Sequence, residues 1–563
     1  MTKRSYLTGL FFFVIAVSAF AQSKPNAQVS DKAVVGKVDE VFARFDKPDS
    51  PGCALGVIKD GQVIYKRGYG QSNLEYGVPI SAGSIFHVAS ISKQFTAMAV
   101  VLLAQQGKLS LDDDVRKYVS EVPDFGERIT IRHLIHHTSG LRDQWSLLEL
   151  AGWREDDVIT EGDILELVSR QKELNFKPGA EHLYCNTGYT LLAVIVKRVT
   201  GQSLREFADA NIFKPLGMTS THFHDDHSMI VKGRTSAYQR QKGGGLKVSI
   251  PVFDTYGATS LFTTVEDLAK WDQNFIDKKV GGEAAINQML TVGVLNDGKN
   301  LNYAFGLSLS QYKGLNTVGH GGADAGYRAD YLRFPEQHFA VVCLCNVSNA
   351  DPGANTRKVA DIYLAGLLKS PPPKPGASAS TGSYKATDQE LQRKAGIYRD
   401  PLTEDTIKLE FRDGKLIAAI GPGFQLVPTS ATDFTVISAP VKVTFEISPD
   451  GSTRRMLVHE EGSPKPRVLD LVNAPAPIAL VQYAGRYYSS ELDTSYTFVV
   501  KEGKLVLQRK KFEGATLTTV GGDSFTHPDL GTIRFTRDPN NLVTGFELNA
   551  GRVRHLKFAR QVN

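Results

Sequence analysis

A stretch rich in proline, glycine and serine divides this chain of 563 residues into two unequal parts. Three consecutive prolines begin at Pro371, and small residues continue the stretch to Ser383. Proline lacks a backbone donor and small side chains bury little apolar surface, so such a segment does not pack into a core. We therefore assign residues 369–388 as a linker and expect separately folded units on either side of it.

The part that follows the linker contains an internal repeat. Short alternating segments separated by glycine turns, with little helical periodicity, are typical of small antiparallel barrels. The repeat therefore predicts two β-barrels of like design, over residues 389–473 and 474–563. Its matching runs, at an offset of 89 residues, are Ala395–Tyr398 with Ala484–Tyr487 and Asp413–Leu416 with Glu502–Leu505.

The N-terminus has the parts of a secretory signal peptide. Lys3 and Arg4 precede an apolar run, and Ala19-Phe20-Ala21 offers an A-x-A cleavage site. The apolar run is shorter than the roughly 20 residues of a spanning helix, which disfavours the alternative of a membrane anchor. We expect residues 1–21 to be removed, no integral membrane segment after cleavage, and a periplasmic or secreted protein.

The charge of the chain excludes little but favours no polyanionic partner. Loss of Lys3 and Arg4 with the signal lowers the formal net charge from +5 to +3. A nearly neutral chain gives no argument for nucleic-acid binding, so we expect a small-molecule or peptide partner instead.

Three motifs in the first part bring together the residue types of an acyl-transfer site. Ser90 and Lys93 lie one helical turn apart, Tyr184 opens a Tyr-x-Asn motif 94 residues after Ser90, and His320 opens His-Gly-Gly after 230 residues. A serine hydroxyl needs a neighbouring base, and a buried lysine or a phenol near a cation can serve. Each motif alone is weak evidence, but the three in this order predict a serine nucleophile.

The order and spacing of these motifs resemble the serine β-lactamase and penicillin-binding-protein superfamily, whose signature is S-x-x-K, S-D-N and K-T-G. Tyr-x-Asn in second place is the pattern of class C β-lactamases, D-Ala-D-Ala carboxypeptidases and related esterases. His-x-Gly in third place resembles the D-aminopeptidase and esterase side of the group. With two barrels after it, the domain resembles the three-domain D-aminopeptidases.

Local signals along residues 34–368 extend the resemblance over one large domain. Lys59-Asp60-Gly61 predicts the turn of an opening hairpin, a helix is expected to end at Gly201, and Thr264 is expected to cap another helix. Residues 22–368 are therefore expected to form an α/β (α+β) β-lactamase/transpeptidase-like domain. It would have a central antiparallel sheet flanked by helices, followed by the two small antiparallel β-barrels.

The resemblance implies a catalytic role for three side chains. Ser90 would attack a carbonyl carbon, while Lys93 and Tyr184 move its proton to the leaving group. A cation beside Tyr184 favours the phenolate, which would also activate the water that removes the acyl group. No metal or other cofactor is needed for this chemistry.

The resemblance also implies substrate-binding roles. The backbone N–H groups of Ser90 and of Ala323, which follows Gly321 and Gly322, would bind the oxyanion. Asn186 and Gln144 would hold the substrate amide. His320 stands where many relatives have lysine, and a neutral imidazole there would be a weaker anchor for a substrate carboxylate.

Four cysteines occur in the chain, and we expect them to be buried free thiols. Cys343 and Cys345 alternate along an apolar strand and point to one face, which is a poor geometry for bonding each other. The family fold places the strand of Cys53 beside that strand, which leaves its pairing with one of the two open. Cys185 lies inside the Tyr-x-Asn motif and is assigned no chemistry.

A cluster of histidines and aspartates spans residues 222–227. Imidazoles and carboxylates at such short spacing can bind zinc. The cluster follows a helix and its turn, so we expect a surface loop without a metal.

Together these features predict an exported serine hydrolase that forms an acyl-enzyme on amide or ester bonds, with D-amino-acid peptides as the preferred class. The alternatives are a class C type β-lactamase, a carboxylesterase, and a non-catalytic binder of peptides or peptidoglycan fragments. A binder does not need the full set of Ser90, Lys93 and Tyr184. The sequence leaves open which small peptide, ester or β-lactam is used, the preference for D or L residues, and the oligomeric state.

Overall fold

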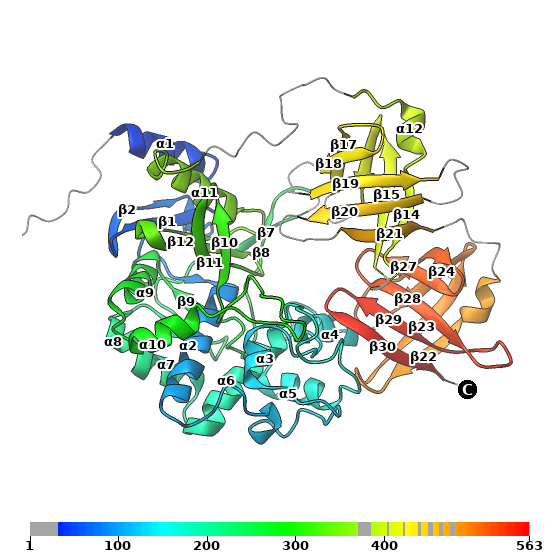
Figure 1. Cartoon of the computed structure of the whole chain (residues 1–563), viewed down its shortest axis with the longest axis horizontal. Coiled ribbons are helices and arrows are strands. Elements are labelled where there is room, and N and C mark those ends of the chain that lie inside the picture. The colour runs from blue at the N-terminus through cyan, green and yellow to red at the C-terminus, as the bar shows by residue number, and fades with distance from the viewer. Residues whose placement is uncertain are drawn as a thin grey trace, which may run out of the picture.

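The computed structural model describes residues 32–241, 243–369, 384–401, 403, 405–419, 423–436, 441–448, 454–460, 466–472 and 479–561. The predicted signal peptide and residues 370–383 of the predicted linker lie outside this described part. The described chain forms one body of helices and sheet and two all-β bodies (Figure 1).

The first body is built on a six-stranded antiparallel sheet. Its first and last strands along the chain pair in the middle of the sheet, from Cys53 opposite Cys345 to Lys59 opposite Phe339. Asp60 and Gly61 both have positive φ, as the predicted hairpin turn requires. In sheet order the strands are β10 (Ser308–Tyr312), β11 (Leu315–Asp324), β12 (Tyr327–Phe334), β13 (Phe339–Cys345), β1 (Cys53–Lys59) and β2 (Gln62–Tyr69).

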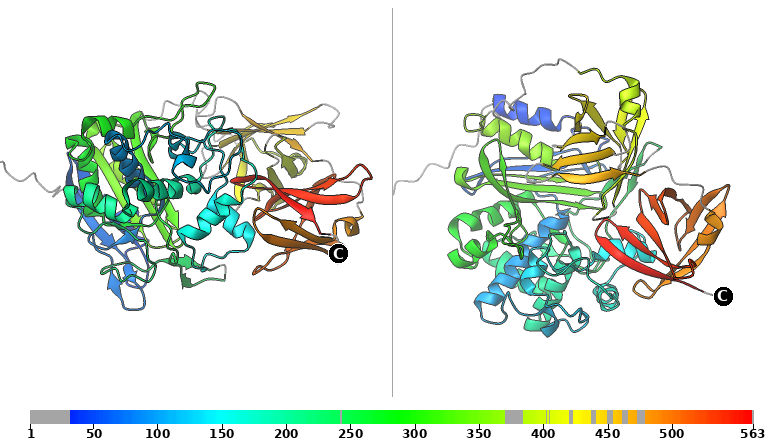
Figure 2. Two further views of the ribbon diagram at one scale, coloured as in Figure 1. Left: turned by 90° about the horizontal axis from the view of Figure 1, so that it is seen from below. Right: turned by 45° about the vertical axis from the view of Figure 1, so that its right-hand side comes forward.

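Helices cover both faces of this sheet, which Figure 2 shows from two sides. All seven residues of β13 are buried, because alternate side chains enter two different cores. Val341, Cys343 and Cys345 pack with α1 and α11, and Val342 and Leu344 pack with the remaining helices. The helices are α1 (Lys32–Phe42), α2 (Ser92–Gln105), α3 (Ile131–Ile135), α4 (Gln144–Ala151), α5 (Glu161–Ser169), α6 (Asn186–Thr200), α7 (Leu204–Ala208), α8 (Lys214–Leu216), α9 (Val265–Asp277), α10 (Gly282–Met289) and α11 (Pro352–Tyr363).

Several local predictions in this body are confirmed. Thr264 caps α9 by accepting a hydrogen bond from the Asp267 N–H at 3.1 Å, and α6 ends at Gly201 with φ 74°. The α2 helix is buried on nearly every side, which makes it the central helix of the body. The short strands are β3 (Gln71–Asn73), β4 (Val78–Pro79), β5 (Phe86–His87), β6 (His222–Phe223), β7 (Tyr238–Arg240), β8 (Leu246–Val248) and β9 (Leu261–Thr263).

The first all-β body is a closed barrel of eight antiparallel strands, preceded by the short helix α12 (Asp388–Gln392). Its core is a separate apolar cluster that includes Tyr398, Leu416 and Leu469. The strands are β14 (Gly396–Arg399), β15 (Thr406–Arg412), β16 (Lys415–Ala418), β17 (Phe424–Pro428), β18 (Asp433–Val436), β19 (Val441–Ile447), β20 (Arg454–Glu460) and β21 (Arg467–Leu471).

The second all-β body repeats this design as a nine-stranded sheet, which confirms the internal repeat. Tyr398 and Tyr487 are both fully buried, and each donates its hydroxyl at 3.0 Å to the carbonyl oxygen four residues earlier. The strands are β22 (Gly485–Ser489), β23 (Thr494–Lys501), β24 (Lys504–Gln508), β25 (Ala515–Thr516), β26 (Thr518–Gly521), β27 (Ser524–His527), β28 (Gly531–Arg537), β29 (Val543–Ala550) and β30 (Val553–Arg560).

The second barrel packs directly on the helical side of the first body, and the two share one apolar core. A buried ion pair joins Arg142 to Glu491. The Arg142 guanidinium also donates to the Arg554 carbonyl oxygen at 3.1 and 2.8 Å, and the Tyr496 hydroxyl donates to the Leu150 carbonyl oxygen at 2.8 Å. The β29–β30 hairpin consequently lies beside α4 (Figure 1).

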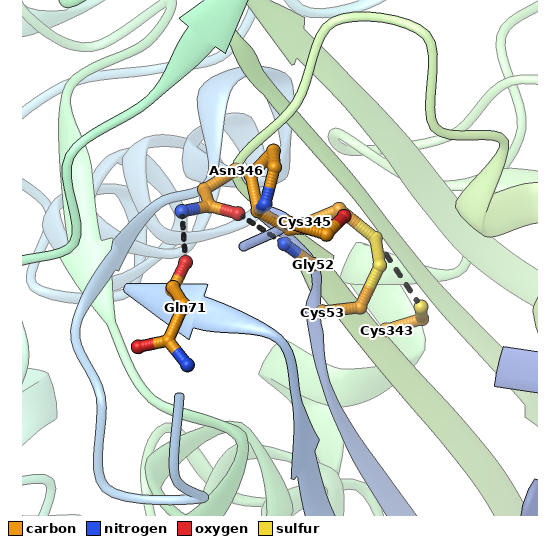
Figure 3. The surroundings of a disulfide bond; sticks show 8 residues. Gly52, Cys53, Gln71, Cys343, Cys345 and Asn346 are labelled. Carbon is orange, nitrogen blue, oxygen red and sulfur yellow. Dashed lines mark hydrogen bonds between the residues drawn. A yellow bond between two sulfur atoms is a disulfide. The ribbon is translucent and has the colours of Figure 1, made fainter. Parts of the chain in front are cut away.

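A disulfide joins Cys53 to Cys345 across paired strands (Figure 3). The expectation of free thiols is therefore wrong for these two residues. The cause is the strand register, which sets them directly opposite each other with 4.0 Å between their Cα atoms. Cys185 and Cys343 are free and buried, and the Cys343 sulfur lies 3.7 Å from the Cys345 sulfur.

Across the described residues, the helices are all too short or too polar to span a bilayer.

Candidate active site

Ser90 lies at the entrance to the central helix. It is half-buried in a 3₁₀ turn, Ala89–Ile91, that leads directly into α2. Ala89 has φ 47°, an unfavourable conformation for alanine, and the Ser92 hydroxyl holds it by donating to its carbonyl oxygen at 2.5 Å. The Ser92 oxygen also accepts from the Leu261 N–H at 3.0 Å. The turn that presents Ser90 is thus fixed from two sides.

Lys93 is fully buried, and its ammonium nitrogen contacts the nucleophile. Nζ donates to Ser90 Oγ at 3.1 Å, to Asn186 Oδ1 at 2.9 Å and to the Ala258 carbonyl oxygen at 2.7 Å. Burial lowers the pKa of Lys93 to about 7. A large fraction of Lys93 is therefore neutral near neutral pH, so it can accept the Ser90 proton.

Tyr184 lies beside both Lys93 and Ser90. The Lys93 Nζ lies 4.8 Å from the centre of its ring. Burial raises the pKa of the phenol well above its ordinary value, although the Ser90 hydroxyl and the Arg552 guanidinium lower it. The phenolate expected from the sequence is therefore disfavoured in the free enzyme, because desolvation outweighs the neighbouring cations.

Asn186 is held by partners inside the protein. Its Nδ2 donates to Asp143 Oδ2 at 2.8 Å, and its backbone N–H donates to the same oxygen at 2.7 Å. Asp143 caps α4, where its other oxygen accepts from the N–H groups of Trp145 and Ser146. Asn186 therefore orients Lys93, and its contact with a substrate amide stays a prediction.

Gln144 is buried in the first turn of α4. Neither its side-chain oxygen nor its nitrogen has a hydrogen-bond partner among the described residues. It is not among the described residues that line the cavity around Ser90. Its contact with a substrate amide therefore stays a prediction.

The His-Gly-Gly motif lies on β11 and lines the cavity with Ser90. Burial lowers the pKa of His320 to about 4, so the imidazole is uncharged. Its Nε2 lies 3.1 Å from the Tyr303 hydroxyl, and its Nδ1 lies 2.6 Å from the Gly321 carbonyl oxygen. A side chain at Gly322 would place Cβ 2.3 Å from the Val88 carbonyl oxygen, so only glycine fits against the Ser90 turn. Ala323 lines the cavity, and its role in binding the oxyanion stays a prediction.

The predicted catalytic residues Ser90 and Tyr184 open onto one cavity of about 1370 Å³, large enough for a short peptide. Asn186 lines it, and residues of the α4 region, β8, β11 and β12 form its walls. Two residues of the second barrel, Phe512 and Arg552, complete the lining. Sequence reasoning missed both, since no local pattern links them to Ser90.

Only the second half of the histidine and aspartate cluster, residues 225–227, lies in a loop as expected. His222 and Phe223 form strand β6, which pairs with β9, and His224 is buried against Phe262. This burial arises because the segment extends the small sheet next to the Ser90 turn. Farther along, His227 Nδ1 pairs with Asp254 Oδ1 at 2.8 Å.

The lowered pKa of Lys93 makes activity dependent on pH. If the neutral amine is the base, kcat/KM is expected to rise about tenfold per pH unit as pH increases toward about 7 and then to level off. Rates measured between about pH 5 and pH 9 would check this. A flat profile across that range would show that Lys93 is not the base.

The fold and site define a serine hydrolase of the β-lactamase class. The chain belongs to the Beta-lactamase family, whose model matches residues 38–364. It is 27% identical over 530 residues to a D-aminopeptidase of Brucella anthropi, covering 91% of this chain and 95% of that protein. A D-aminopeptidase of Gluconobacter oxydans is 29% identical over 362 residues, covering 64% of this chain and 66% of that protein.

Further relatives come from the penicillin-binding proteins. Penicillin-binding protein 4* of Bacillus subtilis is 27% identical over 424 residues, covering 72% of this chain and 91% of that protein. The fold is similar to that of the octameric penicillin-binding protein homologue from Pyrococcus abyssi, with a TM-score of 0.55 at 23% identity, covering 86% of this chain and 99% of that one.

Proposed function

We propose that this hydrolase releases N-terminal D-amino acids from short peptides and amides through an acyl-enzyme on Ser90. The contact of Lys93 Nζ with Ser90 Oγ at 3.1 Å, in a cavity of peptide size, carries the proposal. Similarity to the Brucella anthropi D-aminopeptidase over 91% of this chain supports the substrate class.

In the acylation step, Lys93 takes the Ser90 proton while Oγ forms a bond to the substrate carbonyl carbon. The N–H groups of Ser90 and Ala323 stabilise the oxyanion. The C–N bond then breaks, and the protonated Tyr184 supplies the leaving amine with its proton. Lys93 returns a proton to Tyr184, which restores both groups to their neutral forms.

In the deacylation step, a water molecule gives a proton to Lys93 and its oxygen attacks the ester carbon. The ester C–O bond breaks, and the proton passes from Lys93 to Ser90 Oγ. The free D-amino acid leaves and the resting site is restored.

The proposal includes action outside the cytoplasm, as a periplasmic or secreted enzyme. The basic residues Lys3 and Arg4, the apolar run and the A-x-A site support this location. N-terminal sequencing of the protein from its native compartment is expected to begin after Ala21. An intact N-terminus would contradict export by cleavage.

Hydrolysis of matched anilides tests the activity. The p-nitroanilide of D-alanine is expected to be cleaved at least about tenfold faster than that of L-alanine, and a penicillin is expected to be hydrolysed slowly. Intact-mass spectrometry on the same samples follows the acyl-enzyme. Rapid penicillin turnover would instead indicate a β-lactamase, and cleavage of simple esters alone a carboxylesterase.

A further inference from the structure

The second barrel places a guanidinium inside the active-site cavity. Arg552 lies in the turn between β29 and β30, the hairpin that packs beside α4 (Figure 1). Its Cζ lies 4.9 Å from the centre of the Tyr184 ring, and its Nη1 lies 3.7 Å from Asp143 Oδ2. Ser90, Tyr184 and Arg552 line the same cavity.

The hydrogen-bonding groups of this guanidinium are not used by the protein. Within the part of the chain that the structure describes, Arg552 donates no side-chain hydrogen bond, and its side chain is 43% exposed. Asp143 cannot saturate it, because its two oxygens already accept from Asn186 and from the first turn of α4. An arginine offers a planar set of N–H donors, so this one is available to a ligand in the cavity.

The hairpin that carries Arg552 is held firmly. The Arg552 carbonyl oxygen accepts from Asn175 Nδ2 at 2.9 Å, and the Arg554 N–H donates to Asn175 Oδ1 at 2.8 Å. The Arg554 carbonyl oxygen accepts from Arg142, which is paired with buried Glu491. The backbone that carries Arg552 is therefore already ordered, so only the side chain loses conformational entropy when a ligand binds.

The other candidates for a cation in the cavity are His320, two arginines and Lys247, which is exposed on β8. His320 is uncharged, and both of its ring nitrogens have partners. Arg328 donates to the carbonyl oxygens of Ala325 and Tyr327 at 2.9 and 2.7 Å, and Arg154 is paired with Asp156. Of the arginines among the described residues that line the cavity, Arg552 alone makes no side-chain hydrogen bond.

We propose that Arg552 binds the substrate's free carboxylate, so that the enzyme selects short peptides, dipeptides above all, over neutral amides. A guanidinium and a carboxylate form two parallel charge-assisted hydrogen bonds. The cation that K-T-G chains carry at the position of His320 is thus supplied here from the second barrel. This inference rests on the proposed function, because it names the substrates of the same site.

A pair of substrates that differ only in this carboxylate tests the inference. Wild-type kcat/KM for D-alanyl-glycine is expected to exceed that for D-alanyl-glycinamide by about tenfold or more. Arg552→Ala is expected to bring this ratio close to one, mainly through KM, and Arg552→Lys to keep part of it. Arg554→Ala is the matched control, because it removes a guanidinium from the same hairpin and is expected to keep the ratio.

The ratio of the two kcat/KM values separates binding of the carboxylate from effects on Lys93. Arg552 also lowers the pKa of Lys93, so its loss changes the rates of both peptides, but that change cancels in the ratio. If Arg552→Ala folds poorly, Arg552→Gln removes the charge at similar length and takes its place.

The experiment distinguishes failure of the carboxylate site from failure of the proposed function. A wild-type ratio near one, or a ratio that persists in the Arg552 variants, overturns the carboxylate site. Failure of the wild type to cleave the glycinamide and the D-alanine anilide overturns the proposed function instead.

Discussion

Ser90→Ala is expected to lower kcat by about 10⁴-fold or more on any substrate of this enzyme. The hydroxyl that Lys93 contacts at 3.1 Å, and with it the proposed nucleophile, would be gone. The same variant is expected to lose the acyl adduct with a fluorophosphonate, measured by intact-mass spectrometry. Its fold should persist, because the Ser90 side chain is half-buried beside an open cavity.

Ser92→Ala is the matched control for this prediction. Ser92 lies two residues later, but its oxygen is used by Ala89 and Leu261 to hold the turn. This variant is expected to be less stable and still to form the adduct. An adduct that survived in Ser90→Ala and disappeared in Ser92→Ala would show that Ser92, and not Ser90, is the nucleophile.

Lys93→Ala is expected to lower kcat/KM by about 10³- to 10⁴-fold, the usual contribution of a general base. The expected loss has two causes: the proposed acceptor of the Ser90 proton is removed, and so is the hydrogen bond from Lys93 Nζ to Asn186 Oδ1 at 2.9 Å. Single-turnover kinetics with a D-alanine anilide would measure the effect on the acylation step.

The Lys93→Arg variant distinguishes the role of Lys93 as a proton acceptor from its role as a positive charge. Arginine stays protonated in proteins, so it cannot accept the Ser90 proton. We expect this variant to be about as slow as Lys93→Ala, with no rise in rate near pH 7. If it kept a tenth or more of wild-type activity, Lys93 would act through its charge alone.

The contact between Ser90 and Lys93 could be predicted from the sequence because it is local. Ser90 and Lys93 are one helical turn apart, and the structure brings them to hydrogen-bonding distance. The repeat was equally readable, since Tyr398 and Tyr487 occupy equivalent buried positions in the two barrels. Turn glycines and helix caps report the backbone directly, which is why the hairpin at Asp60 and the cap at Thr264 were also predicted correctly.

The features that could not be predicted from the sequence depend on which distant segments of the chain come into contact. Cys53 pairs with Cys345 because two strands lie side by side in one register, and the sequence does not specify that register. The ionisation of Tyr184 depends on desolvation by the surrounding elements, which disfavours the phenolate that its neighbours alone would favour. Arg552 comes from a barrel hairpin whose own sequence has no catalytic pattern.

The buried Arg142–Glu491 pair has a consequence for how the enzyme is made. Arg142 directly precedes Asp143, the residue that holds Asn186, and its partner Glu491 lies in the second barrel. A ribosome synthesises Ser90, Lys93 and Tyr184 well before Glu491 and Arg552. A nascent chain halted after the first barrel would leave Arg142 without its counter-charge and the cavity without one wall. We therefore expect the hydrolase to become active only after synthesis of the second barrel is complete.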